Sequence, residues 1–96
     1  MATEAEYDEI IAPMLADVAR RCEELGMSMV ARVEWAPDEA GLTKTQREGA
    51  SASQRMASIA AFSRGNVDAF CLEMVRRFDV SNSIFLRKFA EPDNAR

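Results

Sequence analysis

The side chains that could perform acid–base or nucleophilic chemistry are few in this sequence and lie far apart. There is no histidine, so a general base would have to be a carboxylate, a lysine or a cysteine. Asp38 and Glu39 lie among turn-forming residues, where acids are common for structural reasons. Lys44 and Lys88 are the only lysines, and neither lies in an apolar pattern that would make its amine a nucleophile. We therefore expect no catalytic residues and no enzymatic activity.

The sequence also contains no recognised metal-binding or cofactor-binding motif. Cys22 and Cys71 are 49 residues apart and, without histidine, match no known spacing of zinc ligands. The four glycines are isolated, so there is no glycine-rich phosphate loop. Both cysteines fall on apolar faces of expected helices, where reduced cysteines commonly act as small hydrophobic residues. We expect no metal and no cofactor, with a disulfide or redox role for the cysteines as the less favoured alternative.

Length, composition and charge are those of one small domain over residues 1–96. The chain is 48% apolar, but a domain of this size buries only about 60–65% of its unfolded surface, so self-association would stabilise it. A net charge of −4 argues against general affinity for nucleic acid, which depends on lysine and arginine neutralising phosphates. The acidic start and the lack of a long apolar run predict a cytoplasmic protein with no membrane segment.

A long amphipathic helix is expected between Thr3 and Gly26. Thr3 and Glu6 match a capping box, and Gly26 suits the C-terminal end of a helix. Pro13 has no N–H to bond to the carbonyl of Glu9, so it either bends this helix or divides it. Apolar residues recur at intervals of three and four positions and form one predicted stripe, which consists of Tyr7, Ile11, Met14, Leu15, Val18, Cys22 and Leu25.

The segment at about 27–35 alternates with the period of a β-strand, and only Val30 departs from the alternation. Turn-forming residues follow at 36–41, and a more polar segment at about 42–47 predicts the second strand of an antiparallel hairpin. This second strand has no apolar face, which is typical of an exposed edge. The apolar face of the first strand consists of Met27, Met29, Ala31, Val33 and Trp35.

The first strand keeps one edge without an evident partner in the chain. We expect two copies to pair these strands antiparallel about a twofold axis, with the five apolar residues of that strand as the candidate dimer interface. Helices at about 52–64, 66–78 and 82–90 complete an α+β fold, and residues 91–96 are expected to form a mobile tail.

Nucleic-acid binding is the alternative to protein interaction. The two helices around Gly65 resemble a helix-turn-helix in outline, but the second carries Asp68 near its start, an acid at the position where DNA would lie. A regulator would instead use the basic residues of the C-terminal half, namely Arg64, Arg76, Arg77, Arg87 and Lys88.

Several stretches of the chain resemble those of small uncharacterised bacterial proteins, some of them encoded by phages or prophages. These stretches are Glu6 to Leu15, Cys22 to Gly26, the strand that ends in Trp35-Ala36-Pro37, and the corner from Ser63 to Ala69. That group has no established activity, so the resemblance implies no site residues. It implies a small accessory factor, and we expect an intracellular, homodimeric protein-interaction module.

Overall fold

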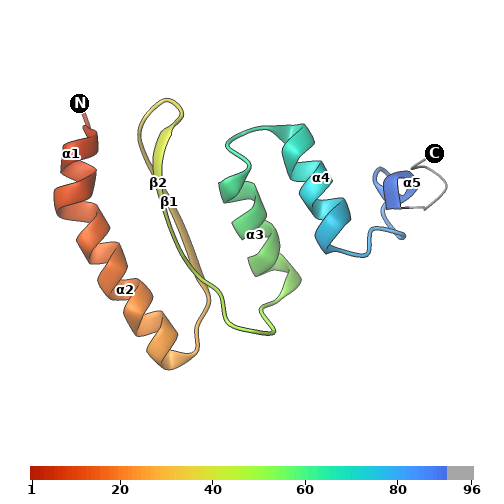
Figure 1. Ribbon diagram of the computed structural model, residues 1–96, viewed down its shortest axis with the longest axis horizontal. Helices are drawn as coiled ribbons and strands as arrows, with labels where there is room; N and C mark the ends of the chain where they lie inside the picture. The colour runs from red at the N-terminus through yellow and green to blue at the C-terminus, as the bar shows by residue number, and fades with distance from the viewer. Residues whose placement is uncertain (91–96) are drawn as a thin grey trace. The chain divides into compact units, whose positions relative to one another are not determined.

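The computed structural model describes residues 1–90, in two compact units, of which the first is Met1–Arg64 and the second begins at Gly65. A long N-terminal helical segment is followed by a two-stranded antiparallel sheet and further helices (Figure 1). The predicted α+β arrangement is thus confirmed. The tail expected at 91–96 lies outside the described residues, and the prediction of a single domain over the whole chain stays a prediction.

The N-terminal segment consists of three contiguous parts, α1 (Glu4–Glu6), η1 (Tyr7–Ile11) and α2 (Ala12–Leu25). The predicted capping box is present, because the Thr3 hydroxyl accepts the N–H of Glu6 at 3.1 Å and a carboxylate oxygen of Glu6 accepts the N–H of Thr3 at 2.9 Å. At the other end Gly26 adopts a left-handed conformation, with φ of 74°, and its N–H bonds to carbonyls of the last turn. The two predicted helix ends are therefore confirmed.

Pro13 does not divide the helical segment, because the preceding turn widens instead. Residues 7–11 form a π-helical turn, in which the N–H of Ala12 bonds to the carbonyl of Tyr7, five residues back. Pro13 then occupies the second position of α2. Since proline cannot donate to the carbonyl of Glu9, a regular α-helix would leave that carbonyl without its donor, and the wider turn changes the bonding pattern just there.

The hairpin consists of β1 (Met29–Ala36) and β2 (Glu39–Thr45), which pair antiparallel with Ala31 opposite Thr43 and Val33 opposite Gly41. Both strands lie closer to the turn than predicted, because the turn is only Pro37 and Asp38 instead of residues 36–41. Gly41, which the sequence pattern assigned to the turn, belongs to β2.

The predicted apolar face of β1 packs against the N-terminal helical segment. The sulfur of Met29 lies 4.0 Å from the sulfur of Cys22, and the rings of Trp35 and Tyr7 have their centroids 5.0 Å apart. Gly41 lies directly beneath the Tyr7 ring, which occupies the space that a Cβ atom would need. The missing side chain of Gly41 therefore allows Tyr7 to become buried.

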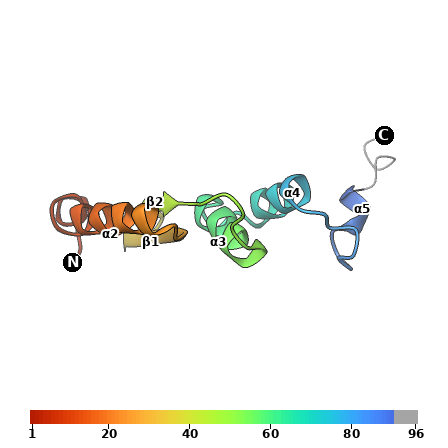
Figure 2. The ribbon, with the colours of Figure 1, turned by 90° about the horizontal axis from the view of Figure 1, so that it is seen from below.

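The opposite face of the hairpin is covered by α3 (Ala52–Phe62), which contacts mainly β1 (Figure 2). Lys44 on this face places its ammonium 5.4 Å from the centre of the Phe62 ring. Val30 pairs with Lys44 and therefore points to the same side, which explains its departure from the alternation. The first unit thus has three layers: helix, two-stranded sheet and helix.

The second unit contains α4 (Val67–Arg77) and α5 (Arg87–Ala90). The side chain of Asn66 accepts the N–H of Ala69 at 2.9 Å and begins α4, and Met74 and Val80 are buried. The helix predicted at about 82–90 is shorter than expected, because residues 81–86 form turns. The Ser83 hydroxyl accepts the N–H of Leu86 there, a local bond that competes with an earlier helix start.

Candidate functional site

The residues with chemical potential remain apart in the structure. Asp38 and Glu39 are exposed at the tip of the hairpin, and Cys22 and Cys71 are unpaired thiols that belong to different units. Within residues 1–90, no group of three or more cysteine or acidic side chains is placed to hold a metal ion. The remaining candidates for a functional site are features of the surface.

The predicted interface residues of β1 lie mostly inside the first unit. Met29, Ala31, Val33 and Trp35 are half-buried on the face covered by the N-terminal helical segment, whereas Met27 is 54% exposed. Their side chains therefore belong first to the core of a single chain. A role for them in a dimer stays a prediction.

The stripe predicted along the first helix is divided in the structure. Leu15 and Cys22 are half-buried and Met29 contacts Cys22, so this row faces the hairpin. The other row is between 37% and 67% exposed, and we call it the exposed stripe: Ile11, Met14, Val18 and Leu25. At about 100° per residue the exposed stripe lies roughly a quarter turn around the helix from the buried row. The predicted stripe was too wide for one contact with a two-stranded sheet.

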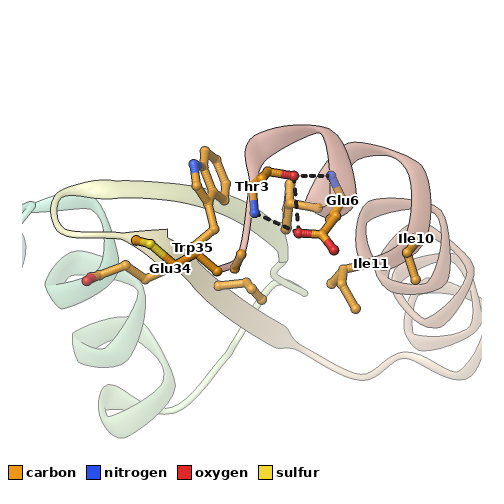
Figure 3. A pocket seen from close by; sticks show the side chains of 10 residues that line it. Thr3, Glu6, Ile10, Ile11, Glu34 and Trp35 are labelled. Atoms are coloured by element: carbon orange, nitrogen blue, oxygen red, sulfur yellow. Dashed lines mark hydrogen bonds between the residues drawn. The ribbon is translucent and has the colours of Figure 1, made fainter.

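An open groove of 450 Å³ lies where the start of the helix meets the end of β1 (Figure 3). Its lining includes Ile10 and Ile11 from the helix and Val33, Glu34 and Trp35 from β1, and none from β2. The exposed stripe, which begins at Ile11, therefore lies on the side of the helix that faces the outer edge of β1. We call this the β1 side of the first unit.

Polar groups of the groove are already engaged with one another. Thr3 and Glu6 form the capping box, and a carboxylate oxygen of Glu34 accepts from Arg32 at 2.9 Å. Few polar groups remain to orient a substrate, and what the groove offers is contact with apolar side chains. Sequence reasoning missed this site, although the adjacent Ile10 and Ile11 and the single tryptophan at the end of a strand were its signals.

The chain matches no protein-family model. No curated protein and no solved structure matches it either. Any inference about function must therefore rest on the surface features of the molecule itself.

The third surface feature is the outer edge of β1. This strand pairs only with β2 among residues 1–90, so its other edge presents unpaired backbone groups. The edge, the exposed stripe and the groove all lie on the β1 side.

The predicted basic patch is only partly assembled. Arg76 and Arg77 both donate to the carboxylate of Glu73, at 3.2 and 2.7 Å, and the bond from Arg77 is the main cause that holds the pKa of Glu73 below its ordinary value. The ammonium of Lys88 lies 5.2 Å from the centre of the Phe89 ring, and Arg64 belongs to the first unit. Two of the five cations therefore share one counter-charge.

No helix within residues 1–90 combines the length and the apolar character needed to cross a membrane.

Proposed function

We propose that this chain is a protein-interaction module, a small cytoplasmic accessory protein of the kind that phages and prophages encode, and that it acts as a homodimer. The observation that carries the proposal is the coincidence of an unpaired strand edge with exposed apolar side chains on one side of the first unit. Monomeric proteins protect such edges with charge or cover them, because they pair readily with other chains.

Pairing of β1 with β1 of a second copy would provide partners for the unpaired backbone groups of this edge. Two β1 strands, antiparallel about a twofold axis, give one four-stranded sheet, and the half-buried residues Met29, Ala31 and Val33 then lie near the middle of a larger core. A sheet of four strands under helices is also far more stable in isolation than a single hairpin.

Light scattering at micromolar concentration tests the proposal, and a dimer is expected. Replacing Ala31 with proline removes a backbone N–H in the middle of β1, so it should dissociate or unfold the protein. Ala52→Pro is the matched control, because Ala52 is the first residue of α3, a position that tolerates proline. A monomeric wild-type protein contradicts the proposal, and an Ala31→Pro variant that stays folded and dimeric places the interface away from β1.

A further inference from the structure

We propose that the paired β1 strands of the homodimer have one defined register, in which Val33 lies opposite Val33 of the copy on the twofold axis. Arg32 of each chain then lies opposite Glu34 of the other. The inference rests on the proposed homodimer and specifies which residues of the two chains meet. It also assigns the occupant of the groove, whose open side receives the β1 strand of the copy.

The groove opens at the outer edge of β1. It is lined by three consecutive residues of this strand, Val33, Glu34 and Trp35, and by no residue of β2. Consecutive side chains of a strand point to opposite faces of the sheet, and Glu34 and Trp35 point away from each other in Figure 3. A groove that takes side chains from both faces of one strand opens past the free edge of that strand. A second strand that pairs with this edge therefore closes the groove.

The helices on the two faces of the hairpin leave this edge accessible. α2 lies mainly over β2, so the α2 helices of the two chains stay over the outer strands of the four-stranded sheet, three strand spacings or about 14 Å apart. α3 contacts mainly β1 on the other face and lies beside the part of the hairpin away from the turn (Figure 1). An axis at Val33, in the half of β1 nearer the turn, places the two α3 helices toward opposite ends of the sheet.

The two faces of the strand limit the possible registers. Met29 and Trp35 both contact the N-terminal helical segment, so the odd-numbered side chains of β1 point to that face. Residues that lie opposite each other in an antiparallel pair share a face, so odd-numbered residues pair with odd-numbered ones. The twofold axis therefore passes at a residue of β1 and not between two residues.

Charge selects among the positions of the axis near the middle of β1. Arg32 and Glu34 are the only charged residues of this strand, and both are exposed. An axis at Arg32 places the two arginines directly opposite each other, which is destabilising. An axis at Ala31 places Arg32 opposite Val30 and gives no ion pair. An axis at Val33 places each Arg32 opposite Glu34 of the copy, and the symmetry creates this contact twice.

The same two side chains already bond to each other within one chain. A guanidinium nitrogen of Arg32 lies 2.9 Å from a carboxylate oxygen of Glu34. Across the axis the two pairs lie side by side, so four charges of alternating sign form one network. A network of this kind stabilises more than an isolated exposed ion pair does. Both residues precede the register irregularity between Glu34 and Ala36, so the backbone that pairs here is regular.

The apolar face fits the same register. Trp35, the largest residue on this face of β1, lies opposite Ala31 of the copy, the smallest, and Val33 meets Val33 at the axis. The groove of each chain opens toward the axis, since Val33 is part of its lining. Val33 and Trp35 of the copy then stand on the open side of the groove, and Trp35 becomes more buried in the dimer than in one chain.

Charge reversal tests the register. R32E and E34R each replace two attractive contacts of the homodimer with two repulsive ones, so sedimentation equilibrium should show a dissociation constant raised about tenfold for each. An equimolar mixture of the two variants should restore the wild-type constant, because one chain then carries two acids and the other two bases. Each chain keeps like charges within itself, so recovery reports only the contact between chains.

Glu39→Arg is the matched control, since it makes the same change of charge as E34R on β2 and should leave the dissociation constant unchanged. Failure of the mixture of R32E and E34R to recover overturns this register. Tighter binding of R32E to the wild type than of the wild type to itself places the axis at Arg32 and also overturns it.

Oxidative cross-linking locates the axis independently. Val33→Cys places two thiols opposite each other, at the Cα distance of about 4.5–5.5 Å that opposite residues have and that a disulfide accepts, so a covalent dimer is expected. Ala31→Cys is the matched control on the same face, because its two copies then lie about 13 Å apart along the strands. It should cross-link no more than the wild type, which also contains Cys22 and Cys71. Cross-linking through Arg32→Cys in place of Val33→Cys overturns the register and leaves the proposed homodimer standing, whereas a monomeric wild-type protein overturns both.

Trp35, the only tryptophan, reports on the groove. Closure of the groove by the copy should shift the emission of Trp35 to shorter wavelength in the dimer than in protein diluted below the dissociation constant. The mixture of R32E and E34R should show the emission of the dimer at concentrations where either variant alone is monomeric. Emission that does not change on dissociation overturns the assignment of the groove.

Discussion

Gly41 illustrates how one residue decides the packing of the first unit. The ring of Tyr7 lies where its Cβ would be, and the same ring contacts Trp35. This glycine is required by a close approach and not by backbone conformation, since its φ is not among the positive values. The core at this end of the unit therefore depends on the absence of a side chain.

Gly41→Ala should lower the free energy of unfolding by about 1–3 kcal/mol, because the added methyl group forces the Tyr7 ring out of its site. Urea denaturation followed by Trp35 fluorescence measures the change. Combining Gly41→Ala with Tyr7→Leu should cost less than the sum of the two single changes, since the smaller side chain makes room. Simple additivity would show that the ring and the glycine do not interact.

At the level of elements, one acidic residue stabilises the C-terminal end of α4. Glu73 accepts hydrogen bonds from Arg76 and Arg77, which also suit the negative end of the helix dipole. The bond from Arg77 lowers the pKa of Glu73 in the folded chain. Its contribution to stability is therefore fully present above the ordinary pKa of glutamate and is lost as the pH falls through the lowered value.

Glu73→Gln should remove that pH dependence. We expect the helical circular dichroism of the wild-type protein to fall on acidification through the range below the ordinary pKa of glutamate, and the fall to be smaller in the variant. Asp68→Asn is a control at the opposite end of the same helix, because Asp68 lies in its first turn. Equal acid sensitivity of wild type and Glu73→Gln would assign the pH response to other carboxylates.

Features that depend on residues close together in the sequence could be predicted, whereas features that depend on contacts between distant segments could not. Thr3 and Gly26 bounded the first helix correctly because capping acts within a few residues. Gly41 was assigned to the turn because local statistics do not reveal that Tyr7 approaches from another element. The groove was missed for the same reason, since it exists only where two distant segments meet.

At the level of the whole molecule, the charge distribution favours interaction with protein over nucleic acid. The chain carries a net charge of −4, and two of the five cations considered for nucleic-acid binding already share Glu73. A labelled DNA duplex should therefore show no binding in fluorescence anisotropy, even at about 50 mM salt. Binding that weakens steeply between about 50 and 200 mM salt would instead support the regulator alternative.

The π-helical turn before Pro13 determines which residues of the N-terminal segment face the hairpin. In an uninterrupted α-helix Tyr7 would share a face with Met14 and Val18, which are exposed, yet Tyr7 is buried against the hairpin. Pro13→Ala should therefore raise intrinsic helix propensity and still lower the melting temperature, because a regular turn would swing Tyr7 away from Gly41. A calorimetric rise in melting temperature would contradict this. The proline thus helps to set the rotation of the helix, which presents its aromatic residue to the sheet and leaves a row of aliphatic residues exposed.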